Sequence, residues 1–216
     1  MLKGFLEESM VRRAARMGAV DLHVADVRDF AQDARRTTDD RPYGGGPGMI
    51  MKPEPLFEAV EALKTPGARV LLMSPAGRPF CQGEARALSA EAHLILVCGH
   101  YEGVDERFVE AHVTDEISIG DYVLTNGVLP AAVVTDAVVR LLPGVLGGGA
   151  EAVADESFSQ SLLEHPQYTR PPVFRGMRVP AVLQDGNHSH IAAWRRQRAL
   201  DRTTRRRPDL LAQPVR

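Results

Sequence analysis

The sequence contains little cysteine and no long apolar run. Its 216 residues include only two cysteines, Cys81 and Cys98, which form no CxxC motif and are too few for a disulfide framework. No run reaches the roughly 18 apolar residues of a membrane span, and the N-terminus lacks the apolar region of a signal peptide. We therefore expect a cytoplasmic protein in a reducing compartment, without a membrane segment.

Three motifs of common enzyme classes are also missing. The absence of GxxxxGKS and GxxxxGKT excludes a P-loop nucleotide hydrolase, and the absence of GxGxxG after a strand argues against a Rossmann dinucleotide site. No GxSxG elbow is present for an α/β-hydrolase. The pair His188 and His190 stands without cysteines or a matching carboxylate cluster, so no metal site is expected.

Charge is unevenly distributed along the chain, although the formal net charge is only −2. Residues 170–216 contain 11 arginines and three acidic residues, a net charge of +8. Residues 1–169 contain 15 basic and 25 acidic residues, a net charge of −10. An acidic body with a basic tail indicates a polyanionic partner, and a solvated basic helix is the alternative interpretation of the tail.

Hydrophobic periodicity predicts an α/β fold. Continuous apolar stretches predict strands at 70–73, 94–98 and 117–124, with a helix at 82–92 between the first two and a helix at 130–142 after the third. Apolar strands that alternate with helices favour a parallel sheet covered on both faces. The other expected elements are a helix over 6–17, an alternating strand over 20–24, a helix over 53–63, and a C-terminal helix with Ile191, Trp194 and Leu200 facing inward and Arg195, Arg196, Arg198 and Arg202 facing outward.

Glycines follow each of the three predicted strands of this sheet. Gly77 follows the first strand, Gly99 and Gly103 the second, and Gly120 the third. In open α/β sheets, ligands bind outside the carboxyl ends of the strands, where the backbone approaches them closely. A turn explains any one of these glycines equally well, but three exits together favour a shared pocket. The segment RPYGGGPG at 41–48 is predicted to be a structured glycine-rich loop.

Six motifs give the sequence a specific family resemblance. They are RPYGGGPGM at 41–49, CGHYEGVDER at 98–107, SIGDYVL at 118–124, PGVLG at 143–147, YTRP at 168–171 and GNH at 186–188. In this order they closely resemble the bacterial tRNA (guanine-N1-)-methyltransferases of the TrmD type. The resemblance extends from roughly Arg12 to Leu211, which is nearly the whole chain.

The resemblance implies an α/β fold of the SPOUT methyltransferase superfamily. In that fold the strand-exit loops form a deep trefoil knot around S-adenosyl-L-methionine, and a small helical C-terminal domain follows. The implied division is a catalytic domain over 1–148, a linker over 149–168 and a basic, helical tRNA-binding domain over 169–216. The resemblance further implies a homodimer with the active site at the subunit interface, and methylation of tRNA at N1 of guanosine-37, immediately 3′ of the anticodon.

The chemistry of that reaction indicates which residue types are needed. Guanine N1 carries a proton at neutral pH, so a general base must lie within hydrogen-bond reach, and a cation near O6 would stabilise the developing negative charge. The resemblance places the cation at Arg140. It takes the base from an aspartate in the linker. Alignment on the Ser-Phe pair that follows places Glu156 at this position, whereas counting forward from Gly147 places Asp155 there. We favour Asp155, because the longer glutamate would displace the base; two solvated linker acids are the alternative.

The resemblance assigns the remaining site residues to two groups. The cofactor-binding residues are Ser74, Pro75, Gly99, Tyr101, Glu102, Ile119, Gly120, Asp121, Tyr122, Val123, Leu124 and Gly127. The substrate-binding residues are Tyr43, Gly44, Gly45, Gly46, Ser157, Arg195, Arg196 and Arg202. The arginines would contact phosphates, whereas the glycine-rich loop is as readily explained as purely structural. No metal ligand is assigned, although the family allows a Mg²⁺ requirement.

The sequence departs from the family pattern at two further places. Asn126-Gly127-Val128 stands where the family has Gly-Gly-Glu, so any role of that glutamate is lost, while asparagine tolerates positive φ and should preserve the loop. The family also has a β-strand before the first helix, and a misassigned start codon would explain its absence. Two alternative functions follow: a SPOUT methyltransferase for another RNA nucleotide, and an inactive tRNA-binding relative.

Overall fold

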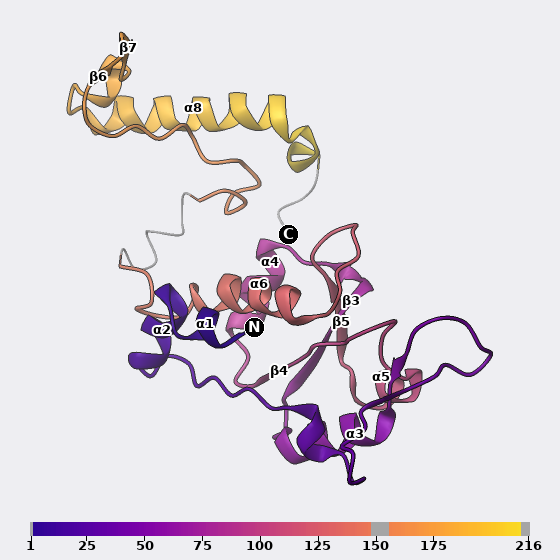
Figure 1. The fold of residues 1–216 in the computed structure, drawn as a ribbon. Coiled ribbons are helices and arrows are strands. Elements are labelled where there is room, and N and C mark those ends of the chain that lie inside the picture. Colours follow the sequence, from indigo (N-terminus) through magenta and orange to yellow (C-terminus); the bar gives the residue numbers. More distant parts are fainter. Residues whose placement is uncertain (1, 148–155, 213–216) are drawn as a thin grey trace. The chain divides into compact units, whose positions relative to one another are not determined.

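The chain forms two compact units, Met1–Gly147 and Gly148–Arg216. A computed structural model describes residues 2–147 and 156–212 (Figure 1). Within these residues, no helix is long and apolar enough to cross a membrane.

The first unit is built around a three-stranded parallel sheet. The central strand β3 (Arg69–Pro79) lies between β4 (Leu94–Val97) and β5 (Asp115–Ser118). The pairing places Leu71 opposite Leu96 of β4 and opposite Asp115 of β5. The parallel sheet that the apolar stretches predicted is thereby confirmed.

Helices cover both faces of this sheet, because successive side chains of β3 point to opposite faces. Leu71 and Met73 pack against α4 (Gln82–Ser89) and α6 (Val128–Val139), in a core that includes Leu88 and Val134. Val70 and Leu72 pack on the other face with residues of α3 (Pro53–Leu63) and α5 (Glu106–His112), including Leu56 and Phe108. Figure 1 shows the two helix layers on either side of the strands. These four β3 side chains are buried, which explains the continuous apolar stretch at 70–73.

The N-terminal part of the chain packs on the α6 side of the sheet. Helices α1 (Leu2–Leu6) and α2 (Ser9–Arg16) contact α6, and Ala14 of α2 shares a buried cluster with Val139 and Val145. The strand predicted over 20–24 is wrong. That segment is irregular and Val24 is 65% exposed, because alternation alone does not make a strand when no neighbouring strand within the described residues pairs with it.

Two short elements lead from this segment to α3. A 3-10 helix, η1 (Val27–Phe30), is followed by the two-residue strands β1 (Asp39–Asp40) and β2 (Ile50–Met51), which pair antiparallel. The glycine-rich loop connects β1 to β2. Its two ends are therefore held together by strand pairing while its tip projects from the pair (Figure 1).

The second unit is organised around one long helix, α8 (His188–Arg206). It is preceded by a hairpin of β6 (Val173–Phe174) and β7 (Met177–Arg178) and by the 3-10 helix η2 (Ala181–Leu183), and it is followed by η3 (Pro208–Leu211). The hairpin was not expected from the sequence. Its turn residues Arg175 and Gly176 have φ of 49° and 79°, the positive values that a tight hairpin turn requires.

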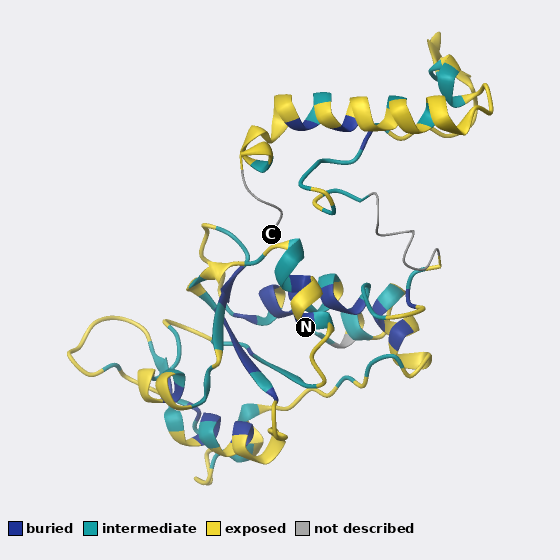
Figure 2. Cartoon of the chain, turned by 180° about the vertical axis from the view of Figure 1, so that it is seen from behind, coloured by how far each residue is buried: buried dark blue, intermediate teal, exposed yellow. Residues whose placement is uncertain are grey.

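The inward face of α8 differs from the expected one. Ala199 and Thr203 are buried and Trp194 is half-buried, whereas Leu200 is 42% exposed. Arg202 is half-buried as well, and its guanidinium donates to the Glu164 carbonyl at 3.1 Å. The expected inward position of Leu200 and outward position of Arg202 are therefore wrong. Most of the other surface of α8 is exposed (Figure 2).

Candidate active site at the carboxyl ends of the strands

The first strand exit is a bulge within β3. The chain leaves the β5 ladder after Met73 and rejoins it at Arg78, opposite Ile117 in both cases. Ser74 is half-buried and accepts a hydrogen bond from the Ala76 amide at 3.1 Å, while Pro75 is exposed. This excursion brings Ser74 and Pro75, two of the expected cofactor residues, to the edge of the sheet.

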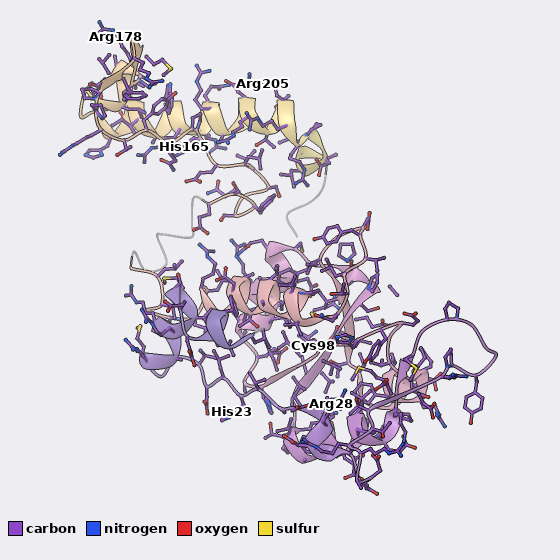
Figure 3. All side chains as sticks on the ribbon, viewed as in Figure 1. His23, Arg28, Cys98, His165, Arg178 and Arg205 are labelled. Carbon is purple, nitrogen blue, oxygen red and sulfur yellow. The ribbon has the colours of Figure 1, made fainter. Side chains whose placement is uncertain are left out.

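The second exit follows β4 at Cys98 (Figure 3). Burial raises the pKa of the Cys98 thiol to about 11, so this cysteine stays protonated at neutral pH. Beyond Gly99, the residue Tyr101 has a φ of 57°, a left-handed conformation uncommon for tyrosine, and its side chain is 50% exposed. The ring of His100 lies 4.6 Å from the Tyr101 ring. This exit therefore presents an exposed aromatic side chain beside the sheet.

The third exit, after β5, is a compact loop with exposed apolar side chains. Gly120 has a φ of 150°, and its carbonyl accepts a hydrogen bond from the Tyr122 amide at 2.9 Å. The Tyr122 hydroxyl donates to the Ile119 carbonyl at 3.2 Å. Tyr122, Val123 and Leu124 are 55%, 84% and 37% exposed. Asp121 is exposed too, so most of this loop is accessible to a ligand.

The second and third exits are in direct backbone contact. The Gly127 amide donates to the Gly99 carbonyl at 2.8 Å, and His100 forms a bridge with Asn126. A Cβ on Gly127 would lie 2.8 Å from Cys98 Cα and 3.1 Å from Met73 Cβ. The three exits therefore meet around Gly127, and only a residue without a side chain fits there.

The glycine-rich loop is attached to the second exit. The Glu102 amide donates to the Met49 carbonyl at 3.2 Å, and the Met51 amide donates to the Gly103 carbonyl at 2.9 Å. Gly48 lies directly against the Glu102 side chain. Gly44, Gly45 and Gly46 are exposed with positive φ, and Tyr43 is fully exposed at 100%. The structure thus brings the predicted substrate loop to the predicted cofactor loop.

The predicted catalytic residues lie in both units. Arg140 is half-buried at the C-terminal end of α6, where its amide donates to the Asp136 carbonyl. Asp155 lies outside the described residues. Glu156 is half-buried in the second unit, and the next residue, Ser157, accepts a hydrogen bond from the Glu164 amide at 3.0 Å.

The three arginines predicted to bind tRNA differ in their surroundings. Arg195 and Arg196 are exposed on α8, as expected. Arg202 is bound to the Glu164 carbonyl, so part of its hydrogen-bonding capacity holds the second unit together. Sequence periodicity missed this difference, because it assigned helix faces without the partner segment.

Asn126 acts differently from the expectation based on backbone conformation. Its φ is not positive. Its side-chain oxygen instead accepts a hydrogen bond from the Val128 amide at 3.0 Å, at the start of α6. This bond from a side chain to the backbone two residues further on is the Asx turn that asparagine commonly forms, and that property identifies the role that tolerance of positive φ did not.

The chemistry of this loop cluster fits an adenosine-containing cofactor. Its exposed side chains include Tyr101, Tyr122, Val123 and Leu124 together with the acidic Glu102 and Asp121. Backbone groups hydrogen-bond the edge of an adenine, and apolar side chains cover its faces. Among the described residues, no group of three or more His, Cys, Asp or Glu side chains is arranged to hold a metal ion.

A parallel sheet with glycine-rich loops at its carboxyl edge is typical of the α/β proteins that bind a ligand at the strand exits. Comparison with known sequences gives the family. Residues 1–213 match the family described as tRNA (Guanine-1)-methyltransferase TrmD, and the chain belongs to this family.

Several curated relatives are similar over nearly their whole length. The tRNA (guanine-N(1)-)-methyltransferase of Moorella thermoacetica is 58% identical over 216 residues, which cover 98% of this chain and 86% of the relative. That of Myxococcus xanthus is 57% identical over 218 residues, covering 100% and 87%. That of Geobacillus kaustophilus is 55% identical over 213 residues, covering 98% and 87%.

Proposed function

We propose that this protein transfers a methyl group from S-adenosyl-L-methionine to N1 of guanosine-37 in tRNA, the nucleotide 3′ of the anticodon. The family match over residues 1–213 carries this proposal. The meeting of the three strand exits around Gly127 supports it, because it brings their loops together at the edge where α/β sheets bind their ligands.

The loop cluster would hold the cofactor. Backbone groups of residues 99–102 and 119–124 would bind the adenosine. Ser74 and Pro75, in the first strand exit, would also contact the cofactor. S-adenosyl-L-methionine supplies an electrophilic methyl group on a positively charged sulfur. The exposed Tyr122 and Leu124 side chains would exclude water from the adenine.

The protein's own chemical task is to make guanine N1 a nucleophile. Asp155, or Glu156 in the alternative alignment, would accept the N1 proton as the general base. Arg140 would stabilise the negative charge that develops on O6 as that proton leaves. The loop at Tyr43–Gly46, whose following residues Gly48 and Met49 contact Glu102, would shape the guanine pocket.

The wider architecture is part of the same proposal. We expect a SPOUT-type deep trefoil knot in the catalytic domain 1–148, a linker over 149–168 and a tRNA-binding domain over 169–216. We also expect a cytoplasmic homodimer that completes the active site. Leu129 and Val133 on α6 are 56% and 48% exposed, and burial of such apolar side chains is a common source of dimer stability. A Mg²⁺ requirement is tested by adding a chelator to the assay below.

A methyl-transfer assay with paired tRNA transcripts tests the proposal. Purified protein is incubated with labelled S-adenosyl-L-methionine and transcripts that carry G or A immediately 3′ of the anticodon. We expect label only in the G transcript, at N1. Label in both transcripts would indicate a methyltransferase for another nucleotide, and label in neither, with tRNA still bound, would indicate an inactive tRNA-binding relative.

Single substitutions show which of the two linker carboxylates is the general base. Asp155→Ala should reduce the rate of methyl transfer by roughly 10²–10⁴-fold, the usual contribution of a general base. Glu156→Ala should retain most of the activity, and the reverse result would assign the base to Glu156. Full activity in both variants would show that neither residue is the base.

A further inference from the structure

The second unit contains a cavity of about 570 Å³. All of its lining residues belong to this unit, and they come from residues 165–172, from residues 179–184 and from α8. Ligand sites in proteins have volumes of roughly 300–1,000 Å³. The cavity is therefore large enough for a nucleotide, and it is built without residues of the strand-exit loops.

One wall of the cavity is aromatic. Tyr168 lines the cavity and is 49% exposed, and its ring lies 6.3 Å from the Trp194 ring at a tilt of 55°. His165, a buried lining residue beside α8 (Figure 3), lies 6.4 Å from the same indole ring. Trp194 thus supports both rings from behind, and Tyr168 offers a half-exposed aromatic face. Such faces bind unstacked bases.

The polar part of the lining is cationic or neutral. Among the described residues that line the cavity, Arg170 and Arg195 are charged and none is acidic. The Gln184 amide nitrogen donates to the Val179 carbonyl at 3.0 Å. Its amide oxygen and its second N–H are therefore the groups that Gln184 offers to the edge of a base. Two guanidinium groups beside an aromatic face match the phosphate and the base of one nucleotide.

We propose that this cavity binds one unstacked nucleotide of the tRNA, with its base against Tyr168 and its phosphate on Arg170 and Arg195. The inference rests on the proposed function, since it takes tRNA as the partner. It adds a nucleotide-binding site in the second unit to the site that binds the methylated guanosine. The second unit would thereby bind the tRNA through one base as well as through its phosphates. The position of that base would determine the register of the tRNA on this unit.

The fluorescence of the chain's single tryptophan can report ligand binding in the cavity. Trp194 is the only tryptophan, so the fluorescence of the full-length protein reports on the cavity wall. Titration with a tRNA transcript should change the Trp194 emission, whereas titration with S-adenosyl-L-methionine should leave it unchanged. A tRNA that binds without changing this emission would contradict the proposal.

Substitutions of Tyr168 test the stacking contact. Tyr168→Ala should weaken tRNA binding about tenfold, within the range measured for loss of one stacked base, and Tyr168→Phe should restore affinity to within about twofold because it keeps the aromatic face. Phe174→Ala is the matched control, because Phe174 is an exposed aromatic residue of the same unit outside the cavity lining. Equal losses in Tyr168→Ala and Phe174→Ala would overturn the proposal.

Two further comparisons distinguish free nucleotides from tRNA as the ligand, and failure of the cavity proposal from failure of the proposed function. Tyr168-dependent binding of 5′-mononucleotides, combined with tRNA affinity that is unchanged in Tyr168→Ala, would assign the cavity to free nucleotides and overturn the tRNA assignment. Methyl transfer by the wild type with tRNA affinity unchanged in Tyr168→Ala overturns the cavity alone. Tyr168-dependent tRNA binding without any methyl transfer leaves the cavity in place and overturns the proposed function.

Discussion

At the scale of single residues, Gly127 is packed tightly against backbone at the point where the strand exits meet. Gly127 has a φ of −78°, so its importance lies in space and not in backbone conformation. A side chain there would meet the backbone of Cys98 and Gly99 at 2.8 and 3.0 Å. These are main-chain atoms that cannot rotate away, so the two exits would have to separate.

Gly127→Ala should therefore destabilise the protein by roughly 1–3 kcal/mol, as overpacking commonly does, and weaken binding of S-adenosyl-L-methionine at least about tenfold. Calorimetric titration and thermal unfolding measure the two effects. Gly4→Ala is the control, because Gly4 lies in α1 and a Cβ there has no neighbour within 4 Å. Cofactor binding by Gly127→Ala at wild-type affinity would place the cofactor away from these loops.

The sequence identified the residues of the loop cluster but not the bonds that each one makes. Glycines after apolar stretches predicted a shared pocket at the strand exits, and the exits do come into contact at Gly127, because the carboxyl ends of parallel strands share one edge. The contacts of Asn126 and Arg202 depend on segments that the fold brings to them, the start of α6 for the first and the Glu164 carbonyl for the second. Local patterns contain no information on such partners.

At the scale of elements, one carboxylate joins β3 to β5. Asp115 is only 15% exposed and accepts hydrogen bonds from Arg69 at 2.6 Å and Arg78 at 2.5 Å. Burial of Asp115 raises its pKa, but the hydrogen bonds from the two arginines outweigh this effect and lower it below the ordinary value. Its stabilising effect is therefore present above the unfolded-state pKa of about 3.9 and is lost as pH falls through the lower folded-state pKa.

Asp115→Asn should lower the free energy of unfolding at pH 7 by about 1–3 kcal/mol, because it weakens hydrogen bonds between charged groups in a half-buried position. The difference from the wild type should narrow as the pH falls below about 4. Urea unfolding at a series of pH values measures it. Asp29→Asn removes an ion pair with Arg36 in which the side chains are 65% and 50% exposed, and it should have little effect; a pH-independent loss in Asp115→Asn would contradict the charge argument.

A buried hydroxyl of α8 joins this helix to the segment at Leu163. Thr203 is fully buried, and its hydroxyl donates to the Ala199 carbonyl at 2.7 Å while accepting from the Leu163 amide at 2.8 Å. Thr203→Val keeps the shape but leaves the Leu163 amide without its acceptor, which should cost about 1–3 kcal/mol.

Unfolding of this unit can be followed through Trp194 fluorescence. Thr204→Val is a matched control, since the Thr204 hydroxyl is exposed and donates only within α8, to the Leu200 carbonyl at 2.9 Å. We expect it to leave the unfolding midpoint nearly unchanged. Equal midpoints in the two variants would show that the contact with Leu163 contributes nothing to stability.

Element prediction succeeded where burial determines the pattern and failed where pairing does. The strand at 70–73 is buried on both faces, so its apolar stretch was unambiguous. The segment 20–24 alternates in sequence but has no strand partner within the described residues, and the hairpin at 173–178 is exposed on both strands. Its signal was the Arg175-Gly176 turn, which is weaker than the asparagine-glycine pair typical of such hairpins.

At the scale of the whole molecule, the separation of charge predicts that the two ligands respond differently to salt. The segment from Arg170 carries a net +8, and it includes the exposed Arg195 and Arg196. Binding of tRNA through phosphate contacts releases counterions, so its affinity should fall steeply with salt concentration. The proposed cofactor site lies outside this basic segment and its ligand carries no phosphate, so the affinity for S-adenosyl-L-methionine should change little over the same range.

Arg196→Gln tests the contribution of one of these charges. It should weaken tRNA binding and reduce the slope of log affinity against log salt concentration by about one, the value expected for loss of one phosphate contact. Lys64→Gln removes an exposed positive charge from the first unit and should leave the slope nearly unchanged. If both substitutions reduced the slope equally, tRNA would respond to total charge. A loss confined to Arg196→Gln would show that the basic tail provides the phosphate contacts, and that the near-neutral net charge of −2 results from two oppositely charged parts with separate ligands.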